Sequence, residues 1–499
     1  MNFLSQGANM EQYALIFRGH SFGYEVQATA KIFIPAVRFV LCENGEFPEN
    51  ISNTILTEIL HENNDTIINI DIVLHGKCCQ KSETISNSPE RNQLEFTMCS
   101  LLYDALQELT GYTPPWGLLT GIRPVRKVIQ AFEQGMTPQQ AYDSLQSQYR
   151  ISDKKMKLAI DTALVQKDIL PHSPQEIGLY VSIPFCPTRC SYCSFVSHSM
   201  DSAYQLIPEY VDKLCEEIAV LGKMIEKHHL LVQSVYIGGG TPTSVTAEQL
   251  QQIMQAISRN INLSHTREYT VEAGRADTIT QEKLQVILDN RADRISVNPQ
   301  TLQDSVLQAI GRRHTAQQAI DAFELARKMG FDNINMDLIA GLPTDTFEGF
   351  SDTLHKVMEL NPDSITVHTL TVKRSADLYH AERQQTAISE VVKMAELSAE
   401  ILPKNGWNPY YLYRQKNTVG NLENVGYAKK GKENLYNILI MDETQTILGA
   451  GCGASSKIIA KDGDIHRVLN YKFPYEYIHR FEEMMQKKIR IEAELEKLS

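Results

Sequence analysis

Three cysteines lie on one short segment, at positions 186, 190 and 193 of the run F-C-P-T-R-C-S-Y-C. The spacing C-x3-C-x2-C lets three thiolates hold three irons of a cubane iron–sulfur cluster, whereas complete ligation by cysteine needs a fourth. One iron is then open to a small molecule. The alternatives are a loop with incidental cysteines and a zinc site that lacks a ligand. Structural zinc sites are closed tetrahedra, and no second cysteine or histidine pair lies nearby in the sequence. We therefore expect Cys186, Cys190 and Cys193 to bind a cluster.

A glycine run, Y-I-G-G-G-T-P-T, occupies residues 236–243. Consecutive glycines permit close backbone approach and present backbone groups to the amino and carboxyl ends of a ligand. A three-glycine run is weak evidence by itself, but this one ends the predicted strand that follows the cysteine segment. We expect both segments to belong to one ligand site.

Polar residues end the next predicted strands. Glu272, in V-E-A-G-R, could accept a hydrogen bond from a ribose hydroxyl or could be a solvated edge residue. Gln300, Arg312 and Asp337 finish or follow the two strands after it. Asp337 interrupts an apolar run, and burying a carboxylate is costly unless it is paired or hydrogen-bonded. A ligand or a partner is therefore expected for Asp337.

The elements that must position these residues alternate six times between strand and helix patterns. Such alternation predicts parallel βαβ units, and six units make an α/β fold of the open (β/α)6 barrel type. Active sites of barrels lie at the C-terminal ends of the strands, which is where the cysteine segment and the glycine run are found. The predicted strands are 178–185, 232–239, 268–274, 294–300, 333–342 and 364–370, and the helices between them are 203–227, 247–260, 280–292, 316–329 and 346–360.

We expect three domains: an N-terminal α+β domain over 1–170, the barrel over 171–385, and a C-terminal α+β domain over 386–499. Trp116 and Arg123, in P-W-G-L-L-T-G-I-R-P, could mark a partner or ligand surface, but a rigid connector that packs one tryptophan is favoured. The N-terminal patterns predict strands at 13–17, 24–34 and 67–74, and helices at 93–109, 138–147 and 153–169.

The composition of the chain limits the classes of protein to which it can belong. The 499-residue chain has a net charge of -12, which gives no general electrostatic reason to bind nucleic acid. The N-terminus lacks the pattern of a signal peptide, and no apolar run is long enough to span a membrane. Nine cysteines in a chain of this length do not make a disulfide framework. These features predict a cytoplasmic protein.

The order of the motifs resembles that of the radical S-adenosylmethionine (SAM) enzymes. Over about residues 177–460 it is similar to the oxygen-independent coproporphyrinogen III oxidase family, in Y-x-x-I-P-F-C-x3-C-x-Y-C, G-G-G-T-P, R-I-S-x4-Q, G-R and D-L-I-x-G-L-P. The N-terminal part, Y-R-Q-K-N and G-N-L-E-N-V-G-Y resemble its longer coproporphyrinogen dehydrogenase branch. The resemblance implies that the three cysteines bind a [4Fe-4S] cluster whose fourth iron is chelated by SAM. One electron then cleaves SAM to a 5′-deoxyadenosyl radical that abstracts a hydrogen atom.

The resemblance also implies roles for individual residues. Tyr180, Gly239 and Glu272 would contact the SAM at the cluster, and Tyr192 would pack beside it. Tyr180, Arg312 and Asp337 are the expected catalytic residues. A second site, which holds another SAM in the oxidase, would be lined by Gly240, Thr241, Gln300, Arg312 and Asp337, with backbone contacts from Thr369 and Ser455.

The implied reaction is the oxidative decarboxylation of two propionates of a tetrapyrrole to vinyl groups. A flavodoxin or ferredoxin donates the electron that cleaves SAM, and an electron acceptor takes the electron that remains when CO2 leaves. Two residues depart from the oxidase pattern: Phe195 replaces a further cysteine, and Ser182 replaces a histidine. A related heme chaperone also lacks that cysteine, but it carries H-N-x-x-Y-W where this chain begins Gly420-Asn421. A heme-binding or trafficking protein and a radical SAM methyltransferase acting on a tetrapyrrole are the alternative functions.

Cys452, in G-A-G-C-G-A-S-S, is a further cysteine that the resemblance places near the SAM at the cluster. It could act as a hydrogen-atom or electron relay. A small residue that fills space in a glycine loop is the favoured interpretation.

Overall fold

The computed structural model describes residues 11–34, 38–43, 45–86, 89–170, 173–193, 197–371, 388–415, 418 and 421–497. The chain packs as two compact units. The first takes the chain up to Ile122 together with Gln130–Lys157, and the second takes Arg123–Ile129 and the chain from Leu158 onward. The division into three domains stays a prediction.

The first unit is built on a five-stranded sheet with the strand order β2-β1-β3-β4-β5. β1 is parallel to both of its neighbours, and β3, β4 and β5 are joined as antiparallel hairpins. Two helices, α1 and α2, pack against the sheet around one apolar core. The strands are β1 (Gln12–Arg18), β2 (Arg38–Cys42), β3 (Asn53–Glu62), β4 (Asp65–Leu74) and β5 (Lys77–Ser86), and the helices are α1 (Gly23–Phe33) and α2 (Arg91–Thr110).

The strand predicted over 24–34 is wrong, because this segment forms helix α1. Val26, Ala30 and Phe33 are buried in α1, and this spacing of three and four residues follows the period of a helix. The alternation read in this segment extends over too few residues to outweigh that period. Trp116 is buried, with 2% of its surface exposed, as the connector interpretation expects.

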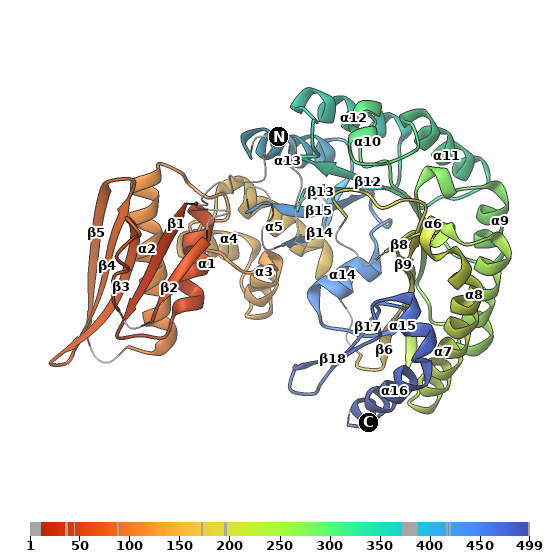
Figure 1. Ribbon diagram of the computed structural model, residues 1–499, viewed down its shortest axis with the longest axis horizontal. Coiled ribbons are helices and arrows are strands. Elements are labelled where there is room, and N and C mark those ends of the chain that lie inside the picture. Colours follow the sequence, from red (N-terminus) through yellow and green to blue (C-terminus); the bar gives the residue numbers. More distant parts are fainter. Residues whose placement is uncertain are drawn as a thin grey trace, which may run out of the picture. The chain divides into compact units, whose positions relative to one another are not determined.

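The second unit contains the predicted α/β barrel, and the fold is confirmed. Six strands run parallel in the order of the sequence, and helices α8, α9, α11 and α12 form an outer rim around them (Figure 1). Four of the rim helices begin after a threonine whose hydroxyl accepts a hydrogen bond from a backbone N–H of the first turn, which explains where they start. The strands are β6 (Glu176–Ile183), β9 (Leu231–Gly239), β10 (Glu268–Gly274), β11 (Arg294–Val297), β12 (Ile334–Ala340) and β13 (Ser364–Thr369). The helices are α7 (Ile207–Lys227), α8 (Ala247–Asn260), α9 (Gln281–Asp289), α10 (Asp304–Ala309), α11 (Ala316–Lys328) and α12 (Phe347–Leu360).

The C-terminal strands extend this sheet at both edges, so that it has eleven strands. β16 (Thr446–Ala450) lies parallel to β6, and β17 (Ser455–Ile459) and β18 (Ile465–Leu469) follow it as antiparallel strands. At the opposite edge, β15 (Glu423–Ala428) pairs antiparallel with β13, and β14 (Asn408–Arg414) pairs with β15. The remaining helices are α3 (Pro124–Glu133), α4 (Pro138–Tyr149), α5 (Asp153–Gln166), α6 (Met200–Ala203), α13 (Ile388–Lys404), α14 (Leu435–Asp442), α15 (Pro474–His479) and α16 (Phe481–Glu496).

A buried ion pair connects α16 to α7. Lys488 Nζ lies 2.5 Å from Glu217 Oε1, and the two side chains are 2% and 0% exposed. Glu217 also accepts hydrogen bonds from the Gly451 N–H at 2.7 Å, Asn470 Nδ2 at 2.8 Å and the Tyr477 hydroxyl at 2.5 Å. One carboxylate thereby joins two helices to the glycine-rich loop around Cys452. Within the described ranges, no helix combines the length and the apolar character needed to cross a membrane.

Candidate functional site

The cysteine loop begins where β6 ends. Its first cysteine belongs to a short strand, β7 (Phe185–Cys186), which pairs with β8 (His198–Ser199). Within the described residues none of the three cysteines forms a disulfide bond; Cys186 and Cys190 are buried, and Cys193 is partly exposed. The loop is fastened to the segment after α10, because the Ser191 N–H donates to the Ile310 carbonyl at 3.0 Å and the Thr188 hydroxyl donates to the Gly311 carbonyl at 3.1 Å. Phe195 lies outside the described residues.

The glycine run lies directly against this loop. The Gly240 and Thr241 N–H groups donate to the carbonyls of Ile183 and Phe185, at 2.8 and 2.7 Å. The Thr241 hydroxyl donates to Cys186 Sγ at 3.5 Å. A Cβ at Gly240 would lie 2.6 Å from the Phe185 oxygen and 3.0 Å from Cys186 Sγ, so only glycine fits here. The structure thus brings the two motifs of the sequence analysis together.

Tyr180 belongs to a stack of three tyrosine rings, and Glu272 lies beside this stack. Tyr180 stacks with Tyr236 and Tyr436, with ring centroids 6.2 and 6.0 Å apart, and Tyr236 and Tyr436 lie 4.4 Å apart. The Tyr236 hydroxyl donates to Glu272. Burial raises the pKa of Glu272 to about 7, against the lowering effect of the Tyr236 hydrogen bond. A carboxyl group is therefore held at the strand end in a state that titrates near neutral pH.

Gln300 follows the end of β11, Asp337 lies within the neighbouring strand β12, and Arg312 follows helix α10. Gln300, which has a positive φ of 69°, donates its N–H to the Asp337 carbonyl at 2.9 Å. Burial raises the pKa of Asp337, but His368, 3.8 Å away, and Asn335, which donates at 2.7 Å, outweigh burial, so that this pKa lies below its usual value.

Arg312 connects the segment that follows β11 to the cysteine loop. One Nη donates to the Asn298 carbonyl at 2.6 Å, and the other donates to the Tyr192 hydroxyl at 3.2 Å. Buried Gln300 Oε1 and Arg312 Nε make no hydrogen bond to the described residues. Because a polar atom buried without a partner is costly, these two atoms favour a bound ligand at this position.

Thr369 and Ser455 lie on strands at different parts of the sheet. The Thr369 hydroxyl donates to the Glu423 carbonyl at 2.8 Å, and its N–H donates to Asn424 Oδ1 at 2.9 Å, so β15 takes both donors. Ser455 begins β17, and its buried hydroxyl makes no hydrogen bond to the part of the chain that the structure describes. Of the two, Ser455 has the side chain better suited to a ligand.

Cys452 is held by the network around Glu217. Its N–H donates to the Tyr210 hydroxyl, and its thiol donates to the Lys472 carbonyl, both at 2.9 Å. Burial raises the pKa of this thiol far above its usual range. A buried, protonated and hydrogen-bonded thiol favours the space-filling interpretation.

Sequence reasoning missed His368 and Tyr436. His368 lies in β13, where serine, threonine and histidine alternate with isoleucine and valine, so it does not interrupt an apolar run as Asp337 does. Tyr436 belongs to α14, which packs against β9, and no local pattern indicates that a helix so far along the chain lies beside Tyr180.

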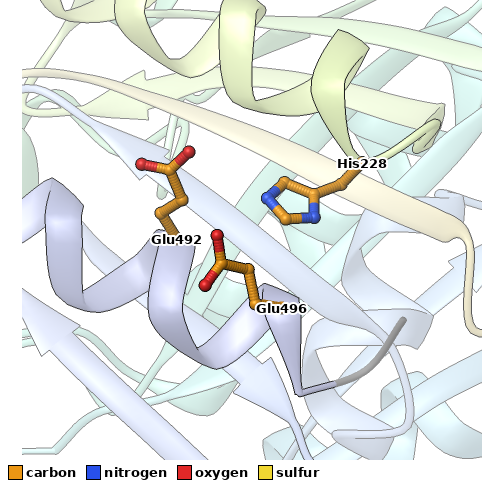
Figure 2. Close-up of side chains that lie close together, drawn as sticks. All are labelled: His228, Glu492 and Glu496. Carbon is orange, nitrogen blue, oxygen red and sulfur yellow. The ribbon is translucent and has the colours of Figure 1, made fainter.

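Three further potential ligands lie close together outside this site. Figure 2 shows His228, at the end of α7, facing Glu492 and Glu496 of α16, and their ligand atoms lie within 4.8 Å of one another. Lys227 Nζ lies 2.6 Å from a Glu492 oxygen and 3.3 Å from a Glu496 oxygen. Because the two carboxylates already share this ammonium group, the arrangement is explained as an ion-pair cluster between two helices.

Fold and site together define a radical SAM protein: residues 180–357 match the model of the radical SAM superfamily. The chain is 41% identical to the oxygen-independent coproporphyrinogen-III oxidase-like protein HemZ of Bacillus subtilis (strain 168), over 80% of this chain and 81% of that protein. It therefore belongs to the family of oxygen-independent coproporphyrinogen-III oxidase-like proteins.

Two further proteins are similar to this chain. The heme chaperone HemW of Lactococcus lactis subsp. lactis (strain IL1403) is 32% identical, over 63% of this chain and 79% of that protein. The structure of the coproporphyrinogen III oxidase HemN from Escherichia coli superposes with a TM-score of 0.51 at 22% identity, over 64% of this chain and 72% of that one. The latter likeness shows a shared fold.

The cofactors of the radical SAM superfamily are a [4Fe-4S] cluster and SAM. The donor set of this chain fits them, since three cysteine side chains lie on one loop and a glycine run without side chains faces the first of them. Partial exposure of Cys193 also leaves one side of the loop accessible to solvent.

Proposed function

We propose that this protein is a radical SAM oxidoreductase that decarboxylates coproporphyrinogen III oxidatively to protoporphyrinogen IX. The observation that carries the proposal is the contact between the glycine run and the cysteine loop, where Thr241 donates to Cys186, in a chain 41% identical to HemZ. When bound, the cluster and SAM supply reductive SAM cleavage and hydrogen-atom abstraction.

In this proposal Cys186, Cys190 and Cys193 hold the cluster. Gly239 leaves room for the methionyl end of the SAM at the cluster, Glu272 accepts hydrogen bonds from its ribose, and Gly240 lines the second site. Tyr180, inside the aromatic stack, excludes water from that side of the site.

Arg312, Gln300 and Asp337 bind a second ligand, which is another SAM or the tetrapyrrole. Gln300 Oε1 and Arg312 Nε, which make no hydrogen bond within the described ranges, support this assignment. A reduced flavodoxin or ferredoxin is the proposed electron donor.

Anaerobic incubation with coproporphyrinogen III, SAM and a reductant tests the activity. Mass spectrometry should detect a product that has lost two CO2 and four hydrogen atoms, together with 5′-deoxyadenosine. Cys190→Ala should abolish the brown colour, the bound iron and both products. A Cys190→Ala protein that retains its full iron content would contradict the ligand assignment.

A heme-binding or trafficking role is the second candidate, because the chain is 32% identical to the HemW chaperone and has Phe195 in place of the oxidase's further cysteine. Titration of the same protein with heme distinguishes the two. Stoichiometric heme binding without CO2 loss from coproporphyrinogen would favour the second candidate.

A further inference from the structure

Arg275, which follows β10 directly, belongs to none of the assignments above. We infer that Arg275 is a positioning residue for the cluster: its guanidinium orders the cysteine loop, and its charge sets the reduction potential of the cluster. The inference rests on the proposed ligation by Cys190 but concerns a residue outside the ligand set.

Arg275 contacts the cysteine loop between its first two cysteines. Its Nη1 donates to the Thr188 carbonyl at 3.1 Å and to the Thr188 hydroxyl at 2.8 Å. The same nitrogen lies 3.9 Å from Cys190 Sγ, within the range of a hydrogen bond to sulfur. Since only 3% of the residue is exposed, little water competes for these contacts.

Asp277 fixes the direction of the guanidinium. Arg275 Nε and Nη2 donate to the two carboxylate oxygens of Asp277, at 2.9 and 2.6 Å. His314, whose side chain is fully buried, lies 3.7 Å from the same carboxylate. Bidentate pairing holds a planar guanidinium in one orientation. One edge of Arg275 is therefore held by Asp277, and Nη1 is left for the loop.

The same position gives Arg275 an electrostatic role. Reduction adds a negative charge to a cluster that is already surrounded by thiolates. A buried cation beside one thiolate stabilises the reduced state more than the oxidised state, and hydrogen bonds to the sulfurs act in the same direction. Arg275 should therefore make the reduction potential less negative, and it should also hold Cys190 in place before any iron is bound.

Three variants separate these effects. Arg275→Gln removes the charge, and Arg275→Lys keeps the charge but loses the planar fork. Arg294→Lys is the matched control: Arg294 is also buried, but it donates to Asn333 and Ser364 at the opposite ends of the strands. Cluster potentials are measured by redox titration followed by electron paramagnetic resonance.

For Arg275→Gln, the ratio of reduced to oxidised cluster at a fixed potential should fall about tenfold or more, which is a shift of about 59 mV for a one-electron couple. In Arg275→Lys and Arg294→Lys, the ratio of reduced to oxidised cluster should stay within about threefold of the wild-type ratio, which corresponds to about half of that shift in potential. A wild-type potential in Arg275→Gln would overturn the electrostatic part of the inference.

The loop is tested separately in the iron-free protein. Trypsin cleaves after the exposed Arg189, and mass spectrometry measures the rate at that bond. Cleavage should be about fivefold faster in both Arg275 variants, because local opening costs less, and unchanged in Arg294→Lys. An Arg275→Lys protein that is cleaved after Arg189 at the wild-type rate would overturn the positioning role. If Arg275→Gln does not fold, the cleavage rate of Arg275→Lys is sufficient for this test. Because no iron is present, this result does not depend on the Cys190→Ala test of ligation.

Discussion

Glu272 lies where a carboxylate is difficult to keep charged. It is partly buried beside the stacked rings of Tyr180, Tyr236 and Tyr436, and the Tyr236 hydroxyl donates a hydrogen bond to it. Its pKa of about 7 means that folding takes up a proton between pH 4.5 and 7, because the ordinary value is 4.5. Stability from this group is therefore lost as the pH rises through that window.

Glu272→Gln should remove this loss. The free energy of unfolding of the variant should exceed that of the wild type. This difference should grow from about pH 4.5 to pH 7 and should reach roughly 3 kcal/mol at pH values above 7. Urea denaturation of the ligand-free proteins at several pH values measures the difference. Glu216→Gln, at a side chain that is 55% exposed, is the control, with no change in the pH dependence expected. Parallel curves for Glu272→Gln and the wild type would contradict the prediction.

Asp337→Asn tests the second ligand. The substitution keeps the volume and removes the charge, so the melting temperature should change by only a few degrees while product formation falls more than about tenfold, or 1.4 kcal/mol. Asp363→Asn is the matched control. Asp363 is a buried carboxylate at the other end of the strands, where it lies 2.6 Å from Arg327. The Asp363→Asn control should lose stability and keep its activity per folded molecule. If Asp337→Asn instead loses stability and keeps its activity per folded molecule, Asp337 supports only the fold.

At the scale of elements, the sequence was most informative where one pattern decides one element. Valine- and isoleucine-rich runs predicted all six parallel strands, and the threonine caps lie within a residue or two of the predicted helix starts. The short pattern over 24–34 was ambiguous, and α1 forms there instead of a strand. No local pattern could place β16 beside β6, because a parallel neighbour leaves no turn signal between the two strands.

In the site, too, local sequence patterns predicted some features, and only the tertiary structure reveals the others. Motif spacing predicted that the cysteine loop and the glycine run lie together, and they do. Arg275 went unnoticed because an arginine after a strand is usually solvated, and only tertiary packing shows that it is buried against Thr188. Tyr436 likewise reaches the site region from a distant segment.

The contact between α16 and α7 depends on a pair of buried charges. Lys488→Met removes one partner and leaves Glu217 as an unpaired buried carboxylate, so the free energy of unfolding should fall by about 3–5 kcal/mol. Adding Glu217→Gln should recover part of this loss, because the glutamine oxygen can still accept from the Gly451 N–H and the Tyr477 hydroxyl, which both donate to Oε2 of Glu217. Thermal or urea denaturation of the single and double variants measures the recovery. A double variant as unstable as Lys488→Met would contradict this account.

At the scale of the whole molecule, the two tryptophans of the chain fall one in each compact unit. Trp116 is buried in the first unit, and Trp407 is buried in the second, where its indole N–H donates to the Pro362 carbonyl at 2.9 Å. Each residue is thus a fluorescent reporter of one unit.

Trp116→Phe and Trp407→Phe each leave one reporter. Because each unit has its own apolar core, the two variants should unfold in urea at different midpoints, and the circular dichroism of the wild type should follow both transitions. Coincident midpoints in all three proteins would instead indicate a single cooperative unit.

The pairing of β16 with β6 also determines when the cysteine loop can be completed during synthesis. Thr446 follows its partner Ile177 by roughly 270 residues, which a ribosome translates in roughly 15–55 s at about 5–20 residues per second. Throughout that interval the strand that leads into Cys186 has one open edge, and Glu217 still lacks Gly451 and Lys488. Iron delivered to the nascent chain would meet a loop on an unfinished sheet. The order of synthesis thus favours cluster insertion after β16 has been synthesised.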